Sequence, residues 1–262
     1  MSETDSFDWM RRDKWHFAHF DEFQTAMECS KKECSDLHKI NELILALGCT
    51  AIAFFKIPSF FIERSGTSER FVSERFSQSL MFTSFLESIR NSHHTVYLSG
   101  CGFYKNAYYN VRYALEFMVQ SFYIDSKYLN DDFRAKIEVL EKIENDSNYR
   151  GSRLVNKLRL DETCRDEIKN TYWYLSRKIH STHEQFLYTA YHFMDNSYKS
   201  VYVDCNKVSD IYNSMTRVYD LFFVMLLTYL PELRKPLAEN KEFAETIKKH
   251  DLCLLSKVLK NA

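Results

Sequence analysis

The sequence predicts an all-α protein, a multi-helix bundle with a central buried helix pair. Only five Gly and three Pro occur in 262 residues. All-β folds need frequent turns and use Gly and Pro to make them, so this shortage favours long helices with few connections. Aromatic residues make up 16% of the chain, with 21 Phe and 17 Tyr, which indicates a core built from large rings.

The length and composition are those of a globular protein with a sizeable core. Apolar residues make up 45% and charged residues 27% of the chain, a balance that argues against disorder. We expect a single all-α domain over residues 1–262. A loop around Gly66 marks residues 1–66 as a candidate N-terminal helical subdomain.

The helices are predicted from apolar residues that recur at spacings of three and four. The pattern predicts a helix from about Asp13, followed by helices over residues 36–57, 71–97, 103–128, 164–193, 207–230 and 243–258. Pro58 is expected to end the first of the strongly buried helices, because proline lacks the N–H that a helix interior needs. Residues 130–166 carry charges of both signs, and we expect them to form a solvated helical face with a loop near Gly151.

Two apolar runs raise the question of a membrane span. Residues 43–55 and 221–230 contain no charged side chain, but Pro58 and Pro231 follow them closely. Both runs are shorter than the roughly 20 residues that cross a bilayer. The N-terminus also lacks the basic-then-apolar order of a signal peptide. We therefore expect buried helices, no membrane partner and a cytoplasmic protein.

The net charge and the cysteines narrow the function classes. Lys plus Arg (35) nearly equals Asp plus Glu (36), so the basic excess typical of nonspecific nucleic-acid binding is missing, although a local basic patch remains open.

The seven cysteines are scattered, odd in number and never spaced Cys-x-x-Cys. This distribution predicts reduced thiols and neither a disulfide framework nor a zinc site, and no cofactor is expected.

One segment, residues 172–183, carries an arginine and two histidines between apolar residues. His183 falls on the buried stripe of its helix, His180 lies at the flank of that stripe, and Arg177 points roughly opposite to it. The segment 103–128 is the predicted packing partner of this helix and is apolar nearly all round.

Arg112 and Glu116 lie four residues apart on that partner helix. Buried charges must be paired, so these two side chains are expected to pair with each other or to reach across the bundle. A structural ion pair and a pair that orients catalytic groups are both consistent with the spacing.

The segment from Arg177 to His183 resembles the Arg-x(4–6)-His signature of the HEPN superfamily. These are small helical bundles that include metal-independent endoribonucleases of toxin–antitoxin and antiviral systems. The spacing of Arg112, Leu115 and Glu116, followed by Leu175, Ser176, Ile179 and His180, also resembles uncharacterised bacterial helical proteins. The resemblance covers roughly residues 97–195.

The resemblance implies that Arg177 and His183 are the catalytic pair, with RNA as substrate and a homodimer that places two motifs around one strand. It implies that histidine acts as general acid or base, that arginine stabilises charge on phosphorus, and that the 2′-hydroxyl is the nucleophile. His180, Arg112 and Glu116 would form a supporting polar cluster. Two features depart from the pattern: Lys178 follows the arginine, and the two catalytic residues diverge by about 120° on a regular helix.

The alternative prediction is a non-enzymatic helical bundle that binds a protein partner or a small molecule. In that case the Arg/Glu/His cluster is structural. It predicts that His180 or His183 hydrogen-bonds to Glu116 across the helices.

Overall fold

The computed structural model describes residues 24–25, 27–28, 31–62, 78–180 and 204–260, and these residues form helices and turns but no strand. The predicted all-α bundle is thereby confirmed. Its five long helices are α2 (Ser35–Ile62), α4 (Leu80–Gly100), α5 (Tyr104–Lys127), α8 (Glu162–His180) and α10 (Cys205–Tyr229). The shorter elements are α6 (Phe133–Asn145), η2 (Ser147–Tyr149), α7 (Ser152–Val155), η3 (Pro231–Leu233), α11 (Arg234–Glu239), α12 (Lys241–Lys249) and α13 (Cys253–Lys260).

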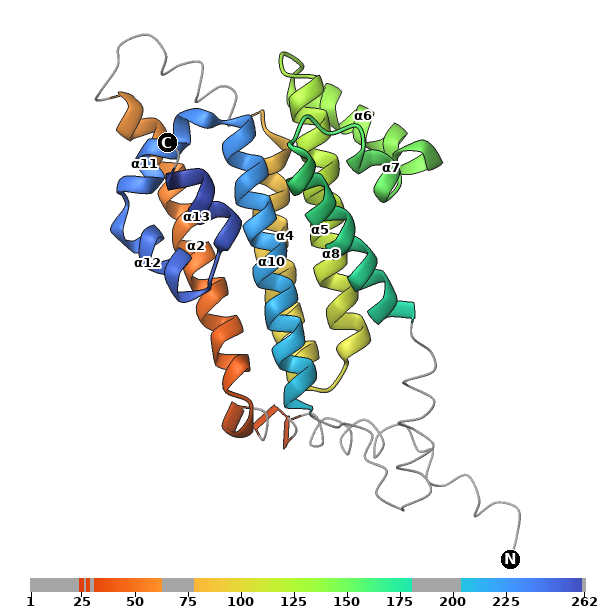
Figure 1. Ribbon diagram of the computed structural model, residues 1–262, viewed down its shortest axis with the longest axis vertical. Helices are drawn as coiled ribbons and strands as arrows, with labels where there is room; N and C mark the ends of the chain where they lie inside the picture. Colours follow the sequence, from red (N-terminus) through yellow and green to blue (C-terminus); the bar gives the residue numbers. More distant parts are fainter. Residues whose placement is uncertain (1–23, 26, 29–30, 63–77, 181–203, 261–262) are drawn as a thin grey trace, which may run out of the picture.

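The long helices form an antiparallel bundle with α5 and α10 as its central pair (Figure 1). Helices α2, α5 and α10 run in one direction, and α4 and α8 run in the other (Figure 1). Helix α5 contacts α4, α8 and α10, while α10 also contacts α2 and α13. Helix α8 packs on both central helices, so its position is fixed by the core of the bundle.

The central helices are buried because their apolar residues follow the helical period. The buried positions of this kind are Tyr108, Val111, Leu115, Met118 and Phe122 on α5, and Ile211, Met215, Val218, Phe222 and Met225 on α10. The ring of Phe85 on α4 stacks on Phe222 with centroids 4.7 Å apart, and the ring of Phe223 meets it edge-on at 5.7 Å. Burial of each such ring stabilises the fold by roughly 1.5–3 kcal/mol. Stacked rings therefore form part of the core, but most of its buried residues are aliphatic, so the expected core of large rings is only partly observed.

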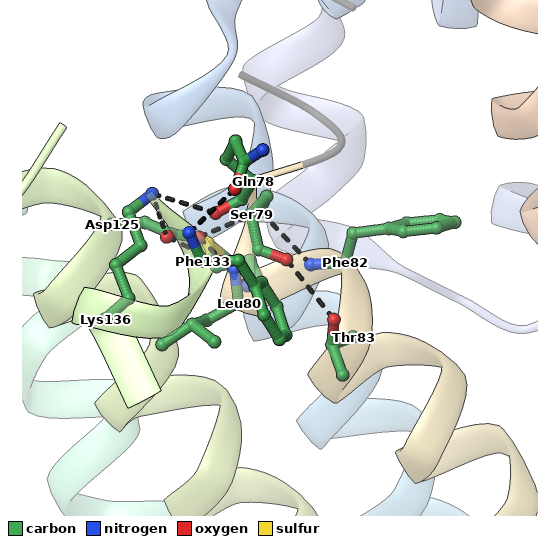
Figure 2. A network of polar contacts seen from close by, with 9 residues as sticks. Gln78, Ser79, Leu80, Phe82, Thr83, Asp125, Phe133 and Lys136 are labelled. Carbon is green, nitrogen blue, oxygen red and sulfur yellow. Dashed lines mark hydrogen bonds and ion pairs between the residues drawn. The ribbon is translucent and has the colours of Figure 1, made fainter. Parts of the chain in front are cut away.

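A buried polar network joins the start of α4 to the end of α5 and the start of α6 (Figure 2). Asp125 accepts hydrogen bonds from the first two N–H groups of α4, at 3.2 and 2.9 Å, and from the Ser79 hydroxyl at 2.8 Å. The Nζ atom of Lys136 lies 2.9 Å from the Asp125 carboxylate and donates to the carbonyl oxygen of Gln78 at 2.9 Å. Both charged side chains are fully buried, and each is satisfied by the other and by the chain around it.

Two predicted helix boundaries are wrong. Helix α2 continues through Pro58 to Ile62. A proline inside a helix removes one hydrogen bond at a cost of about 3 kcal/mol, and a helix of 28 residues can tolerate this loss. The predicted C-terminal helix is divided into α12 and α13. Asp251 has a φ of 54°, which interrupts the helix, and Asp220 of α10 accepts hydrogen bonds from the N–H groups of Leu254 and Leu255.

The expectation that the cysteines are reduced thiols is also wrong for one pair. Cys34 and Cys205 form a disulfide with Cα atoms 5.2 Å apart. The bond links the residue before α2 to the first residue of α10, across 171 positions of sequence. No spacing rule in a sequence reveals a pairing of this length, since it depends on the packing of two distant helices.

Within the helices that are described, none combines the length and the apolar character needed to cross a membrane.

Candidate functional site

The last turn of α8 presents its ionisable side chains in two directions. Arg177 and His180 are exposed, Lys178 is half-buried, and Ile179 between them is buried. The helical period explains this division, because Leu175 and Ile179 lie on the stripe that faces the core. Arg177 therefore faces away from the core, as its spacing predicts.

Arg177 lies over the ring of Trp173, one turn earlier on α8. The guanidinium carbon is 4.7 Å from the centre of the indole ring, within the range of a cation–π interaction. The Trp173 side chain is 60% exposed, the second-largest exposed fraction among the exposed large hydrophobic side chains of the described chain. A planar cation and an aromatic ring are thus held together on an open surface.

Lys178 points the other way, into the seam between α5, α8 and α10. Its Nζ atom lies 3.1 Å from the Asp210 carboxylate, and the hydroxyls of Tyr108 and Tyr174 donate to the two oxygens of the same carboxylate. The ammonium is also 5.8 and 5.3 Å from the centres of these two tyrosine rings. We name Tyr108, Tyr174, Lys178 and Asp210 the Asp210 cluster.

The charges of the Asp210 cluster stabilise one another. Burial alone would raise the pKa of Asp210, but hydrogen bonds from Tyr108, Tyr174 and Lys178 outweigh it and lower the pKa. Burial alone would lower the pKa of Lys178, but the hydrogen bond and charge of Asp210 raise it. The pKa of Tyr174 is raised by burial and then by its bond to the carboxylate. Lys178 is therefore held charged and paired in the seam, and it does not compete with Arg177 on the open surface.

Further contacts hold the same end of the bundle. The hydroxyl of Ser209 on α10 donates to Asp36 on α2, and the Tyr104 hydroxyl of α5 bonds to the N–H of Asp204. The disulfide lies at this end as well, since Cys205 begins α10. The last turn of α8 thus packs at an end of the bundle that these hydrogen bonds and the disulfide stabilise.

Arg112 reaches across the bundle to α8, one of the two alternatives left open by the sequence. Its guanidinium carbon lies 4.6 Å from the centre of the Tyr172 ring, and its Nη2 atom donates to the Tyr172 hydroxyl at 2.5 Å. The Tyr172 ring also lies against Gly151, where an added Cβ would be 3.1 Å from the ring. Arg112 therefore packs Tyr172 against the loop before α7, which is a structural role.

Glu116 does not pair with Arg112. Within the described ranges, no ion pair or hydrogen bond joins these two side chains, although both are half-buried on one face of α5. Likewise, no hydrogen bond joins His180 to Glu116 among the residues that are described. The part of the predicted supporting cluster that can be located is dispersed: Arg112 contacts Tyr172, and His180 lies on the exposed surface.

His183, the second half of the predicted catalytic pair, lies outside the described residues. The structure thus places Arg177 on an exposed surface.

Sequence reasoning missed the Asp210 cluster. Asp210 is 32 residues from Lys178 and 102 from Tyr108, so no local motif connects them. The available signal was weak: Tyr108, Tyr174 and Asp210 each place a polar group at the edge of an apolar stripe. Only the packing of three helices makes these polar groups converge.

Comparisons with known proteins found no matching family model, no matching curated protein and no matching solved structure.

Proposed function

We propose that this protein binds single-stranded RNA at the C-terminal turn of α8 and cleaves it without a metal ion, as an HEPN-like endoribonuclease. The observation that supports this most is the exposed Arg177 guanidinium held over the exposed Trp173 ring. Unstacked bases bind to aromatic rings and to planar arginine side chains, while arginine also neutralises phosphate. This pair therefore supplies the two contacts that a single strand needs in a chain whose net charge is close to zero.

In the proposed reaction Arg177 and His183 divide the chemistry. His183 accepts the proton of the ribose 2′-hydroxyl, and the 2′-oxygen forms a bond to the neighbouring phosphorus. The bond from phosphorus to the 5′-oxygen breaks, and that oxygen takes up a proton. The products are a 2′,3′-cyclic phosphate and a 5′-hydroxyl. Arg177 stabilises the negative charge that builds on the phosphoryl oxygens.

A homodimer is part of the proposal, because one Arg–His pair supplies a single acid or base. The protonated histidine of a second copy would donate to the leaving 5′-oxygen while the first accepts from the 2′-hydroxyl. In this proposal Lys178 has a structural role and does not contact the RNA. Its pairing with Asp210 fixes the last turn of α8, and with it the direction of Arg177.

The test is cleavage of a labelled single-stranded RNA by the purified protein in the presence of EDTA. We expect Arg177→Gln and His183→Ala each to lower the rate by about 100-fold or more, the range for loss of a charge-stabilising or acid–base group. Trp173→Ala should weaken RNA binding. Arg134→Gln removes an arginine from α6 whose side chain is 91% exposed, and it should leave the rate unchanged.

Cleavage that survives His183→Ala with the fold intact would come from a contaminant or another site. RNA binding that depends on Trp173 without any cleavage would reduce the activity to that of an RNA-binding effector.

The alternative function is that of a non-enzymatic bundle that binds a protein partner. A specific observation favours it: Leu86 of α4 and the tyrosines Tyr109 and Tyr113 of α5 are exposed, and the Tyr113 ring stacks on Phe117 with centroids 6.1 Å apart. Exposed aromatic and aliphatic side chains on neighbouring helices are typical of protein interfaces. Absence of RNA binding, together with loss of a captured partner on Tyr113→Lys, would favour this function.

A further inference from the structure

A basic cavity lies on the opposite end of α8 from Arg177. It has a volume of about 270 Å³ and is lined by Phe122, Tyr123, Ser126 and Lys127 of α5 and by Lys157, Leu158 and Arg159 from the segment between α7 and α8. Residues 162 and 177 of α8 are separated by roughly 23 Å along a helix axis. The cavity is therefore separate from the proposed RNA site, since the two lie at opposite ends of α8.

Three cations and no carboxylate line this cavity. Lys127, Lys157 and Arg159 are exposed, and none of them forms an ion pair with a carboxylate in the described part of the chain. Elsewhere on this nearly neutral protein some cations are paired, as Lys169 is with Asp166 at 3.2 Å. Three unpaired cations around one hollow leave an uncompensated positive potential, which attracts an anion.

Aromatic rings hold two of these cations in place. Lys127 donates to the Tyr123 hydroxyl at 3.0 Å, and Lys157 lies 3.5 Å from the centre of the Tyr149 ring. The bond to Tyr123 is the main cause of the raised pKa of Lys127, so this ammonium keeps its charge. Fixing the lysine side chains before a ligand arrives lowers the entropy lost on binding.

The chain around the cavity is basic as well. Residues 147–160 contain four cationic residues and no acidic one, between Asp146 on one side and Asp161 and Glu162 on the other. Arg150 and Arg153 donate to the carbonyl oxygens of Glu144 and Ser147, so they fix the loop and leave the cavity to Lys157 and Arg159. The net charge of −1 for the whole chain does not reveal this local group of positive charges.

We propose that this cavity binds a small phosphate monoester, such as a mononucleotide. A phosphate monoester carries nearly two negative charges at neutral pH, which matches three cations better than a single carboxylate does. The Arg159 guanidinium binds two phosphate oxygens, the two ammonium groups bind as point charges, and the Ser126 hydroxyl donates a further hydrogen bond. The volume suits a small ligand more than a folded partner.

Isothermal titration of the full chain with three probes tests the proposal: inorganic phosphate, adenosine 5′-monophosphate and adenosine, at one ionic strength. We expect the monophosphate to bind and adenosine not to bind. Binding of inorganic phosphate as well would support recognition of the phosphate group alone. Equal binding of adenosine, or no binding of either phosphate, would overturn the proposal.

Matched variants locate the site. Lys157→Gln with Arg159→Gln should weaken monophosphate binding by about tenfold or more, since two charge-assisted contacts are lost. Arg134→Gln with Lys169→Gln removes the same charge from two ion-paired positions outside the cavity and should leave binding unchanged. An equal loss in both double variants would overturn the assignment, and so would equal competition by an oligoribonucleotide without a terminal phosphate. Thermal unfolding of each variant checks that the fold is retained.

Discussion

Arg112 and Arg177 make the same kind of contact in opposite environments. Each guanidinium lies over an aromatic ring of α8, at 4.6 Å from Tyr172 and 4.7 Å from Trp173. Tyr172 is half-buried between two helices and a loop, whereas Trp173 is exposed. Adjacent positions on a helix point about 100° apart, and this rotation separates a packing arginine from one that is open to a ligand.

His250 is a titratable residue in a position that disfavours its charge. Its side chain is 3% exposed, its Nδ1 atom bonds to the Tyr212 hydroxyl at 3.0 Å, and its Nε2 atom is buried with no partner in the described chain. Burial lowers the pKa of His250, and repulsion by Lys249 lowers it further, while Glu42 opposes the shift. The folded protein thus binds a proton at this site less readily than the unfolded chain.

This lowered pKa predicts a loss of stability in mild acid. The stability due to neutral His250 is complete above the unfolded pKa of about 6.5, and it falls as the pH drops below that value towards the folded pKa. We expect the free energy of unfolding to fall less steeply between pH 7.5 and 5.5 in His250→Gln than in the wild type, measured by urea unfolding. Parallel pH profiles for wild type and His250→Gln would refute the role of this residue.

At the scale of the elements, one buried ion pair joins three helices. Asp125 of α5 holds the start of α4, and Lys136 of α6 is 1% exposed beside it (Figure 2). Removing one partner of a buried pair leaves the other charge without compensation, which is more costly than replacing both. The network therefore links the positions of α4, α5 and α6.

We expect Lys136→Met to lower the free energy of unfolding by about 3–5 kcal/mol, the range for breaking a buried ion pair. Asp125→Asn with Lys136→Met should cost less than the sum of the single changes by about 1–3 kcal/mol, because the two sites are coupled. Lys142→Met alters an exposed lysine of the same helix and should stay within about 0.5 kcal/mol of the wild type. Additive costs in the double variant would contradict the coupling.

The helices themselves were predictable, since a period of three and four residues is a local property of the sequence. The long helices α5 and α10 follow that period closely, and both were expected within a few residues of their observed bounds. The features that were missed are not local. Asp125 meets groups that lie 11 and 45 residues away, and the break at Asp251 depends on a cap from α10. The helical period alone predicts that Arg177 faces away from the core, because the period is a local property. The Asp210 cluster requires the packing of three helices.

The disulfide ties together two parts of the chain that are far apart in sequence. Cys34 precedes α2 and Cys205 begins α10, two helices that pack against each other. Closing a loop of 171 residues restricts the unfolded chain, and the chain-entropy model places the gain near an upper value of about 5 kcal/mol.

Reduction should therefore lower the stability of the entire bundle. We expect dithiothreitol to lower the Tm of the wild type by about 10 °C or more, because each kcal/mol shifts the Tm of a protein of this size by roughly 2–4 °C. Cys34→Ser with Cys205→Ser should have the lowered Tm from the start and should not respond to the reductant. Cys49→Ser with Cys253→Ser replaces two exposed free thiols and should behave as the wild type does. Mass spectrometry after alkylation supplies the second measurement. Cys34 and Cys205 should react with iodoacetamide only after reduction, and their alkylation in unreduced, denatured protein would contradict the bond.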